Sequence, residues 1–306
     1  MRARIVVIIL IGGLRLDPVV VAAERARPPE WTSDVQETFF DDARTTLEGP
    51  RPNYKHTSSQ ASPLQQAGSD NTSTSRWSHL ISPSTLETEI KRLSTSLDAA
   101  VTTPSTFKSV GFKPPRRDFS ELAVLLAVIA QYDGDVRWKD VAAAMRDQFA
   151  RAGFNAKVGT DATYREAVDR KQELAALVRG ERPSLPKAEA TVDDWSQVSD
   201  RPPLMQRLET AHDERITKWL TDAAAFRRNR ESIRHEAEIV ALLAEVIHRE
   251  AYEYWDDETF AEYATELRDA ARDTAKAAEA DDLNAARDAA ARATGACTNC
   301  HSGYRG

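Results

Sequence analysis

The sequence predicts an all-α protein that contains two tandem four-helix bundles. Glycine is scarce, with 12 residues in a chain of 306, and alanine is abundant in the C-terminal third. This composition favours packed helices over a sheet. Apolar residues recur there at helical spacing, and a block of the first half returns in the second half. The chain also exceeds the roughly 100 to 200 residues of a usual single domain.

The N-terminal segment, residues 1–23, resembles a secretory signal peptide. Arg2 and Arg4 provide positive charge, an apolar run extends from Ile5 to Leu14, and small residues at 21–23 suit a peptidase. About ten apolar residues are too few to cross a bilayer, which takes roughly 20. We therefore expect export, to the periplasm or another extracytoplasmic location, and no membrane span in the mature chain.

Residues 24–76 are predicted to form a linker. From Asn53 to Arg76 the chain is rich in Ser, Thr and Gln and poor in large apolar groups. Such a segment cannot offset the entropy that ordering would cost, so we expect it to be disordered. In the stretch 33–49, however, apolar residues recur every four positions, which predicts one short amphipathic helix.

The remainder of the chain repeats itself. The segment ELAVLLAVIAQYDGDVRW, from Glu121, aligns without gaps with EIVALLAEVIHREAYEYW, from Glu238, at an offset of 117 residues. The segments that begin at Trp77 and Trp195 align at an offset of 118. Two blocks at nearly the same spacing predict a duplicated helical domain, although two Ala/Leu-rich helices can also align by chance. The predicted units are a first bundle at 77–185, a linker at 186–200 and a second bundle at 201–306.

Four amphipathic helices are predicted in the second copy. The first begins after Pro202 and Pro203, which suit an opening turn, and the second covers about 231–251. The third follows the acidic run Asp256–Glu258, and the fourth begins at Asp281 and Asp282. Because the connections between them are short, these helices predict a four-helix bundle.

The only two cysteines, Cys297 and Cys300, lie beside His301 at the end of the fourth helix. Residues three and four apart share one face of a helix, so all three point the same way. C-x-x-C-H is the attachment signature of c-type haem, in which the thiols form thioethers and the imidazole binds the iron. Alanines at 286, 289, 290, 293 and 296 would leave room for a flat ring. The motif predicts one covalent haem c.

Other uses of the two thiols are less consistent with their surroundings. A zinc site needs further ligands at metal-site spacing, and a thioredoxin-like C-x-x-C opens a helix after a strand. A disulfide between Cys297 and Cys300 would close too short a loop to add stability. They correspond to a second possible function, which stays open. In it, the protein is a haemless, secreted helical adaptor whose cysteines bind metal or remain free.

A C-terminal C-x-x-C-H that is followed by Tyr304 and Arg305, on the last helix of an Ala-rich bundle, resembles a class II cytochrome c of the cytochrome c prime type. The resemblance covers about 202–305. It implies that Cys297 and Cys300 carry the thioethers and that His301 is the proximal iron ligand. It also implies that Arg305 lies near the haem and that the first helix of the bundle faces the open side of the iron.

In the family that the motif resembles, the residue on the open side of the iron determines the function. In relatives that transfer electrons, a Met of the first helix binds the iron, whereas an apolar residue there leaves a pocket for small gases. Met205, Leu208 and His212 form one stripe of this helix. We favour Met205 as the sixth ligand. Alternatively, Met205 is a flexible filler of the core. His212 is then either an ordinary histidine or itself the ligand.

The first copy has no residues suited to hold a haem. At an offset of 118, Met205 matches Glu87, and the three motif residues match Arg179, Arg182 and Pro183. The first copy is therefore predicted to be a haemless bundle that acts as a scaffold or as a partner surface.

Together these patterns predict an exported monohaem c-type cytochrome that transfers single electrons. No Ser/His/Asp set, phosphate loop or nucleotide motif occurs, so we predict no catalytic residues and no enzyme activity. The net charge of −7 argues against nucleic-acid binding and favours a redox partner with a basic face. A homodimer is also compatible with the sequence. A five-coordinate protein that binds or senses gases is the main alternative function.

Overall fold

The computed structural model describes residues 76–304, which fall within one compact unit, Ser69–Gly306. The predicted signal peptide, the linker up to residue 75 with its short helix, and Arg305 lie outside the described residues. The described part is built of helices and contains no strand, which confirms the all-α class. Within it, no helix has the length and the apolar character needed to span a membrane.

The first half surrounds one central helix. α4 is buried at every position from Asp118 to Ala130, because α2, α5 and the later helix α7 pack against it. Ser82 caps α2 by accepting a hydrogen bond from the amide of Thr85. In chain order the elements are a 3-10 turn at Trp77–His79, α2 at Pro83–Ala100, α3 at Pro104–Thr106, a π-helical turn at Phe107–Gly111, α4 at Lys113–Ala130, α5 at Lys139–Asn155 and α6 at Asp161–Arg179.

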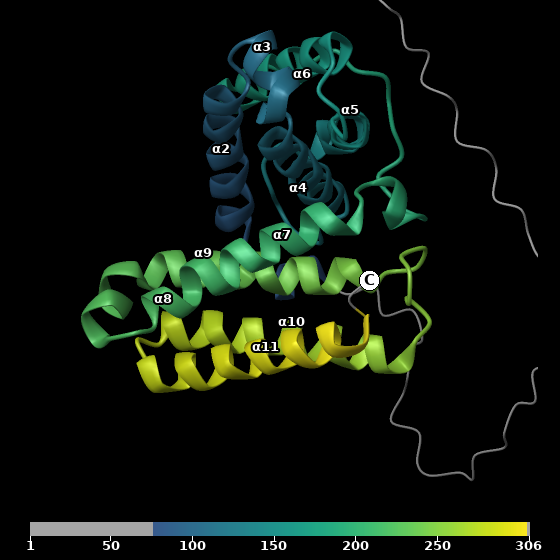
Figure 1. Ribbon diagram of the computed structural model, residues 1–306. Coiled ribbons are helices and arrows are strands. Elements are labelled where there is room, and N and C mark those ends of the chain that lie inside the picture. The colour runs from purple at the N-terminus through teal and green to yellow at the C-terminus, as the bar shows by residue number, and fades with distance from the viewer. Residues whose placement is uncertain (1–75, 305–306) are drawn as a thin grey trace, which may run out of the picture. The chain divides into compact units, whose positions relative to one another are not determined.

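In the second half, α10 packs against both α9 and α11, and α7 packs against α9 and against α4 of the first half (Figure 1). Asp257 caps α10 and Asp282 caps α11, which places both helix starts where their acidic residues predict them. The elements are a 3-10 turn at Trp195–Gln197, α7 at Arg201–Ala211, a π-helical turn at His212–Ile216, α8 at Thr217–Trp219, α9 at Ala223–Ile247, α10 at Glu258–Glu279 and α11 at Leu283–Tyr304.

Two elements of the second half differ from the prediction. The second helix, expected at about 231–251, runs from Ala223 to Ile247. It starts earlier because the side chain of Asp222 accepts hydrogen bonds from the amides of Ala224 and Ala225. It ends earlier because the chain turns sharply after Ile247, with positive φ at Ala251 and Tyr254. The first helix is interrupted by the π-helical turn that begins at His212.

Matched features occur in the two halves. Trp77 and Trp195 each begin a 3-10 turn before the first long helix of their half. Tyr132 donates a hydrogen bond of 2.8 Å to the carbonyl of Ile81, and Tyr252 donates one of 2.8 Å to that of Ser199. Ile81 and Ser199 are separated by the same 118 residues as the tryptophans. A duplication predicts such matched anchors, and the common origin of the halves stays a prediction.

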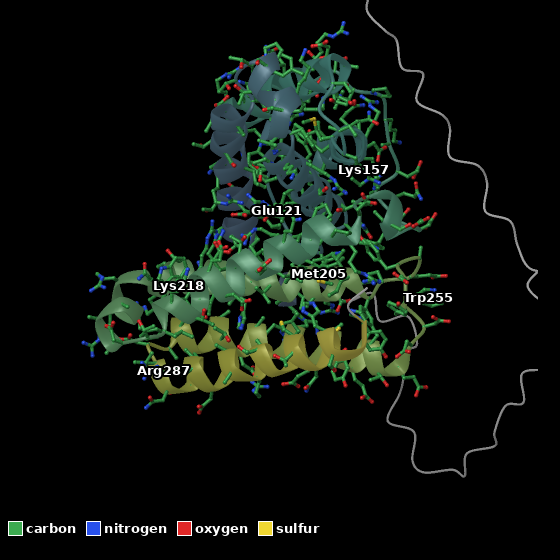
Figure 2. The ribbon with its side chains drawn as sticks, in the orientation of Figure 1. Glu121, Lys157, Met205, Lys218, Trp255 and Arg287 are labelled. Atoms are coloured by element: carbon green, nitrogen blue, oxygen red, sulfur yellow. The ribbon has the colours of Figure 1, made fainter. Side chains whose placement is uncertain are left out.

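A buried ionic cluster joins the two halves. Arg207 of α7 is 2 % exposed and donates to three carboxylates, at 2.6 Å to Glu121, 2.7 Å to Glu236 and 2.9 Å to Glu89. These acceptors belong to α4, α9 and α2, so one guanidinium connects four helices from both halves. Figure 2 labels Glu121, the acceptor on α4. Arg92 also contacts Glu89, at 2.6 Å. Each of the three guanidinium nitrogens of Arg207 thereby donates to a carboxylate, in a geometry that suits its planar fork.

Two contacts in this region join residues that occupy equivalent positions of the repeat. The rings of Trp77 and Trp195 lie 5.6 Å apart, and Glu89 contacts Arg207; both pairs are 118 residues apart. Contact between a residue and its own counterpart is what a two-fold axis produces at a self-complementary interface. Equivalent positions of the predicted repeat thus meet where the two halves contact each other.

Candidate haem site

The last helix holds the motif residues in a fixed position. Cys297, Cys300 and His301 occupy the final turns of α11. The hydroxyl of Tyr304 donates a 2.7 Å hydrogen bond to Asp257 at the start of α10, and its ring packs against Phe260, with centroids 5.4 Å apart. Because these contacts fasten the end of α11 to α10, the motif residues keep one orientation.

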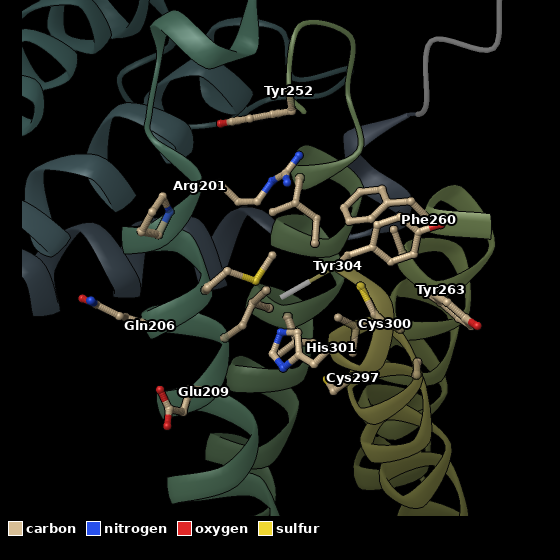
Figure 3. A pocket seen from close by; sticks show the side chains of 18 of the residues that line it. Arg201, Gln206, Glu209, Tyr252, Phe260, Tyr263, Cys297, Cys300, His301 and Tyr304 are labelled. Atoms are coloured by element: carbon tan, nitrogen blue, oxygen red, sulfur yellow. The ribbon is translucent and has the colours of Figure 1, made fainter. Parts of the chain in front are cut away.

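A cavity of about 850 Å³ opens beside the motif (Figure 3). This volume falls within the roughly 300–1,000 Å³ of pockets that hold small organic ligands or cofactors. The cavity lies between α7, α9, α10, α11 and the loop 248–257. Its lining includes both cysteines, His301 and Met205. The structure thus brings the described predicted site residues to one cavity.

Both thiols are free and protonated. Cys297 and Cys300 form no disulfide. Burial raises the pKa of Cys297 to about 11, with a further contribution from the negative charge of Asp213, and burial also raises the pKa of Cys300. In residues 76–304, no group of three or more His, Cys, Asp or Glu side chains is placed to hold a metal ion. The described residues thus give no support to the zinc alternative, which needs additional ligands beside the two cysteines.

One stripe of α7 and its extension faces the cavity. Arg201, Met205, Leu208 and His212 follow one another at helical spacing and all line it. Met205 is half-buried and lines the cavity from α7. Figure 2 shows its position on that helix. Leu208 is buried beside it, so both an iron-ligating sulfur and an apolar group are present on this wall.

His212 is engaged elsewhere. The π-helical turn directs its ring toward α11, where Nε2 lies 2.8 Å from the hydroxyl of Thr294. That hydroxyl donates to the carbonyl of Ala290, so it accepts from the histidine Nε2–H. Burial lowers the pKa of His212, which keeps the ring neutral. These contacts favour Met205 over His212 as a ligand on the open side.

Arg201 is a cavity residue that the sequence analysis missed. Its guanidinium lies 5.0 Å from the ring centre of Phe260 and 5.7 Å from that of Tyr252, and it donates to the backbone carbonyl of Glu253 (Figure 3). Its Nε is buried and has no partner within the described residues. Burial lowers its pKa, although the guanidinium stays charged. The sequence signal that could have identified it is its position four residues before Met205, which places both residues on the same face of α7.

The alanines of α11 have a different role from the predicted one. Of the five, only Ala296 lines the cavity. Ala286, Ala289, Ala290 and Ala293 are buried at the contacts of α11 with its neighbours. Small side chains let the helices approach closely, so these positions make no room for a ring. The space lies instead toward α7 and the loop 248–257.

Comparison with known families agrees with this geometry. Residues 197–305 match the family model described as Cytochrome C'. The second half of the chain is cytochrome c prime-like. The match covers α7 to α11 and the complete C-x-x-C-H motif, and the family implies a haem c cofactor. No curated protein and no solved structure matches the chain.

The residues of the cavity fit such a cofactor. Two free, protonated thiols three residues apart border it together with an imidazole, and the wall formed by α7 provides a thioether. Arg201 lines the cavity with a buried, unpaired Nε, which a carboxylate of the cofactor would satisfy. Cys297, Cys300, His301, Met205 and Arg201 would therefore hold the haem.

Proposed function

We propose that the protein is an exported monohaem c-type cytochrome that transfers single electrons. In this proposal, Cys297 and Cys300 carry the covalent links, His301 is the proximal ligand and Met205 the sixth ligand. The observation that carries the proposal is that Met205 borders the same cavity as the C-x-x-C-H motif. Periplasmic export is supported by the N-terminal sequence and by the usual location of the family.

In this proposal, residues of the cavity would exclude water from the haem and set its reduction potential. When bound, haem c supplies an iron that alternates between the ferrous and ferric states. Leu208, Val240 and Ile247 provide an apolar lining that excludes water. Ligation by His and Met favours the reduced iron and raises the potential. The positive charge of Arg201 acts in the same direction by opposing a gain of positive charge on oxidation. These residues would tune the electron affinity while the fold keeps the site rigid.

A matched pair of methionine substitutions tests the ligand assignment. The holoprotein, produced with haem-maturation machinery, is expected to show low-spin bands and to bind carbon monoxide poorly. Met205→Leu should convert it to a high-spin form that binds carbon monoxide and has a lower potential. Met145→Leu, at a buried position of α5 in the first half, should leave the spectrum unchanged.

Other outcomes of this experiment would support the alternatives. High-spin bands and ready carbon monoxide binding in the wild-type protein would favour the gas-binding function, with Leu208 facing the iron. Absence of covalent haem would leave the helical adaptor. Low-spin bands that persist in Met205→Leu would show that another group is the sixth ligand.

A further inference from the structure

The loop between α9 and α10, residues 248–257, exposes aromatic side chains. Trp255 is 45 % exposed and Tyr254 is 37 % exposed, whereas Trp77, Trp138 and Trp195 are buried. Figure 2 shows Trp255 on the edge of the molecule, away from the helices. Because burying an indole is strongly favourable, an exposed tryptophan in a well-packed unit points to contact with another molecule.

The backbone of the loop holds these rings outward. Tyr252 is anchored in the interior by its hydrogen bond to Ser199, and the amide of Trp255 bonds the carbonyl of Tyr252 at 3.2 Å. Ala251 and Tyr254 have positive φ, of 76° and 63°. Non-glycine residues rarely adopt this conformation, because it is sterically strained. It persists where contacts with the surrounding structure hold the backbone in place. The loop is thus a built feature that displays Tyr254 and Trp255.

Charges around the two rings are predominantly negative. The side chains of Glu250, Glu253, Asp256 and Glu258 are exposed. Of the nearby cations, Arg249 pairs with Glu245 at 2.7 Å and lies over the ring of Trp77. Arg201 lines the cavity and lies 4.0 Å from the carboxylate of Glu253, so Glu250, Asp256 and Glu258 carry the negative charge of the rim. The surface formed by 248–258 therefore has an aromatic centre and an acidic rim.

The same loop reaches the candidate site. Ala251, Tyr252 and Glu253 line the cavity. The ring of Tyr254 lies 5.1 Å from that of Tyr304, which borders the cavity one turn after Cys300. The contact between Tyr254 and Tyr304 thus connects the cavity beside the motif with the exposed rings. Since electron transfer weakens steeply with distance, this surface gives a partner a short approach to the site.

We infer that the surface 248–258 is the docking site for a redox protein whose own contact face has an apolar centre and a basic rim. Specific interfaces place aromatic residues at the centre and charges at the rim, and complementary charge accelerates encounter. A tryptophan is a frequent hot spot in such contacts. The inference rests on the proposed electron-transfer function and deepens it by naming the surface and the chemistry of the partner.

Oxidation of the reduced holoprotein by two small reagents tests this surface. Tris(phenanthroline)cobalt(III) is cationic and presents aromatic faces, whereas ferricyanide is anionic. Glu250→Gln/Asp256→Asn and Trp255→Ala should each slow oxidation by the cobalt complex several-fold at low ionic strength. Neither variant should slow ferricyanide, and a decalysine peptide should inhibit the cobalt reaction of the wild-type protein more strongly than that of the acidic-rim variant.

The matched control is Glu279→Gln/Asp288→Asn, which removes two exposed negative charges near the opposite ends of α10 and α11. Its rate with the cobalt complex should remain near that of the wild-type protein. Equal slowing in the control and the rim variant would overturn the inference, since net charge would then explain the effect. The haem spectrum of each variant is recorded first, so absence of haem refutes the proposed function separately.

Discussion

The two halves of the chain share a helical plan but fill their interiors differently. In the first half, Phe119, Met145 and Phe149 are fully buried, and the rings of the two phenylalanines lie 6.0 Å apart. In the second half, α10 and α11 pack mainly through alanines, and a cavity of about 850 Å³ opens beside Cys297 and its motif. A shared architecture thus supports a solid core in one half and a candidate cofactor site in the other.

The contact between the halves covers one side of the second half. Glu89 contacts Arg207, which occupies the equivalent position of the predicted repeat, at 2.9 Å. The first half therefore covers the surface of α7 around Arg207. A homodimer stays a prediction, and it would need a different face.

The largest expected effect is on the ionic cluster between the halves. Arg207→Met should lower the free energy of unfolding by about 3–5 kcal/mol, because three buried carboxylates lose their common partner. Urea unfolding of the purified chain measures it. The control Arg292→Met removes an exposed arginine that pairs with Asp273, and it should cost about 1 kcal/mol or less. Similar losses in both variants would show that the cluster does not join the halves.

A smaller effect is expected from filling the alanine contact of the second half. Ala293 is 1 % exposed on α11, so Ala293→Leu should force the helices apart and cost about 1–3 kcal/mol. Ala285→Leu, at an exposed position of the same helix, should change stability by about 0.5 kcal/mol or less. Thermal unfolding compares the two. A tolerated leucine at 293 would contradict close packing by alanine.

The smallest expected effect concerns the pH dependence of stability. Burial would raise the pKa of Glu89, but hydrogen bonds from His235 and Arg92 and the charge of Arg207 hold it well below its usual value of 4.5. Burial raises the pKa of Glu121 well above that value, and the negative charge of Glu89 adds to the rise although Arg207 opposes it. The two carboxyl groups therefore influence stability in opposite directions.

Glu89 contributes stability that is present above pH 4.5 and is lost as the pH falls toward its folded-state pKa. Glu121 contributes stability that is present below pH 4.5 and is lost as the pH rises toward its folded-state pKa. Between roughly pH 7 and pH 3, Glu89→Gln should flatten the acid loss of stability and Glu121→Gln should steepen it. Urea midpoints across this range measure both, and parallel profiles would refute the assignment.

Local sequence signals predicted much of the fold. Asp257 and Asp282 cap the last two helices where the acidic residues indicated their starts, and the motif residues share the end of α11 as their spacing predicted. The π-helical turn at His212 was missed, because no local signal marked the inserted residue. The role of the alanines was mistaken, since their small size suits helix contacts as well as a ring.

Features that depend on partners distant in sequence were not predicted. Arg207 resembles any charged residue of an amphipathic helix until α2, α4 and α9 bring three carboxylates to it. Arg201 likewise acquires its position from the rings of Tyr252 and Phe260 in the folded chain. Long-range burial of charge is decided by packing, which the local pattern does not contain.

The central claim is that the two halves differ in haem attachment. Its most direct test is intact and peptide mass spectrometry of the full chain produced with haem-maturation machinery. We predict one covalent haem per chain, carried by the peptide that contains Cys297 and Cys300, and none in Cys297→Ser/Cys300→Ser, which should remain helical by circular dichroism. A wild-type chain that folds and carries no covalent haem would contradict the account.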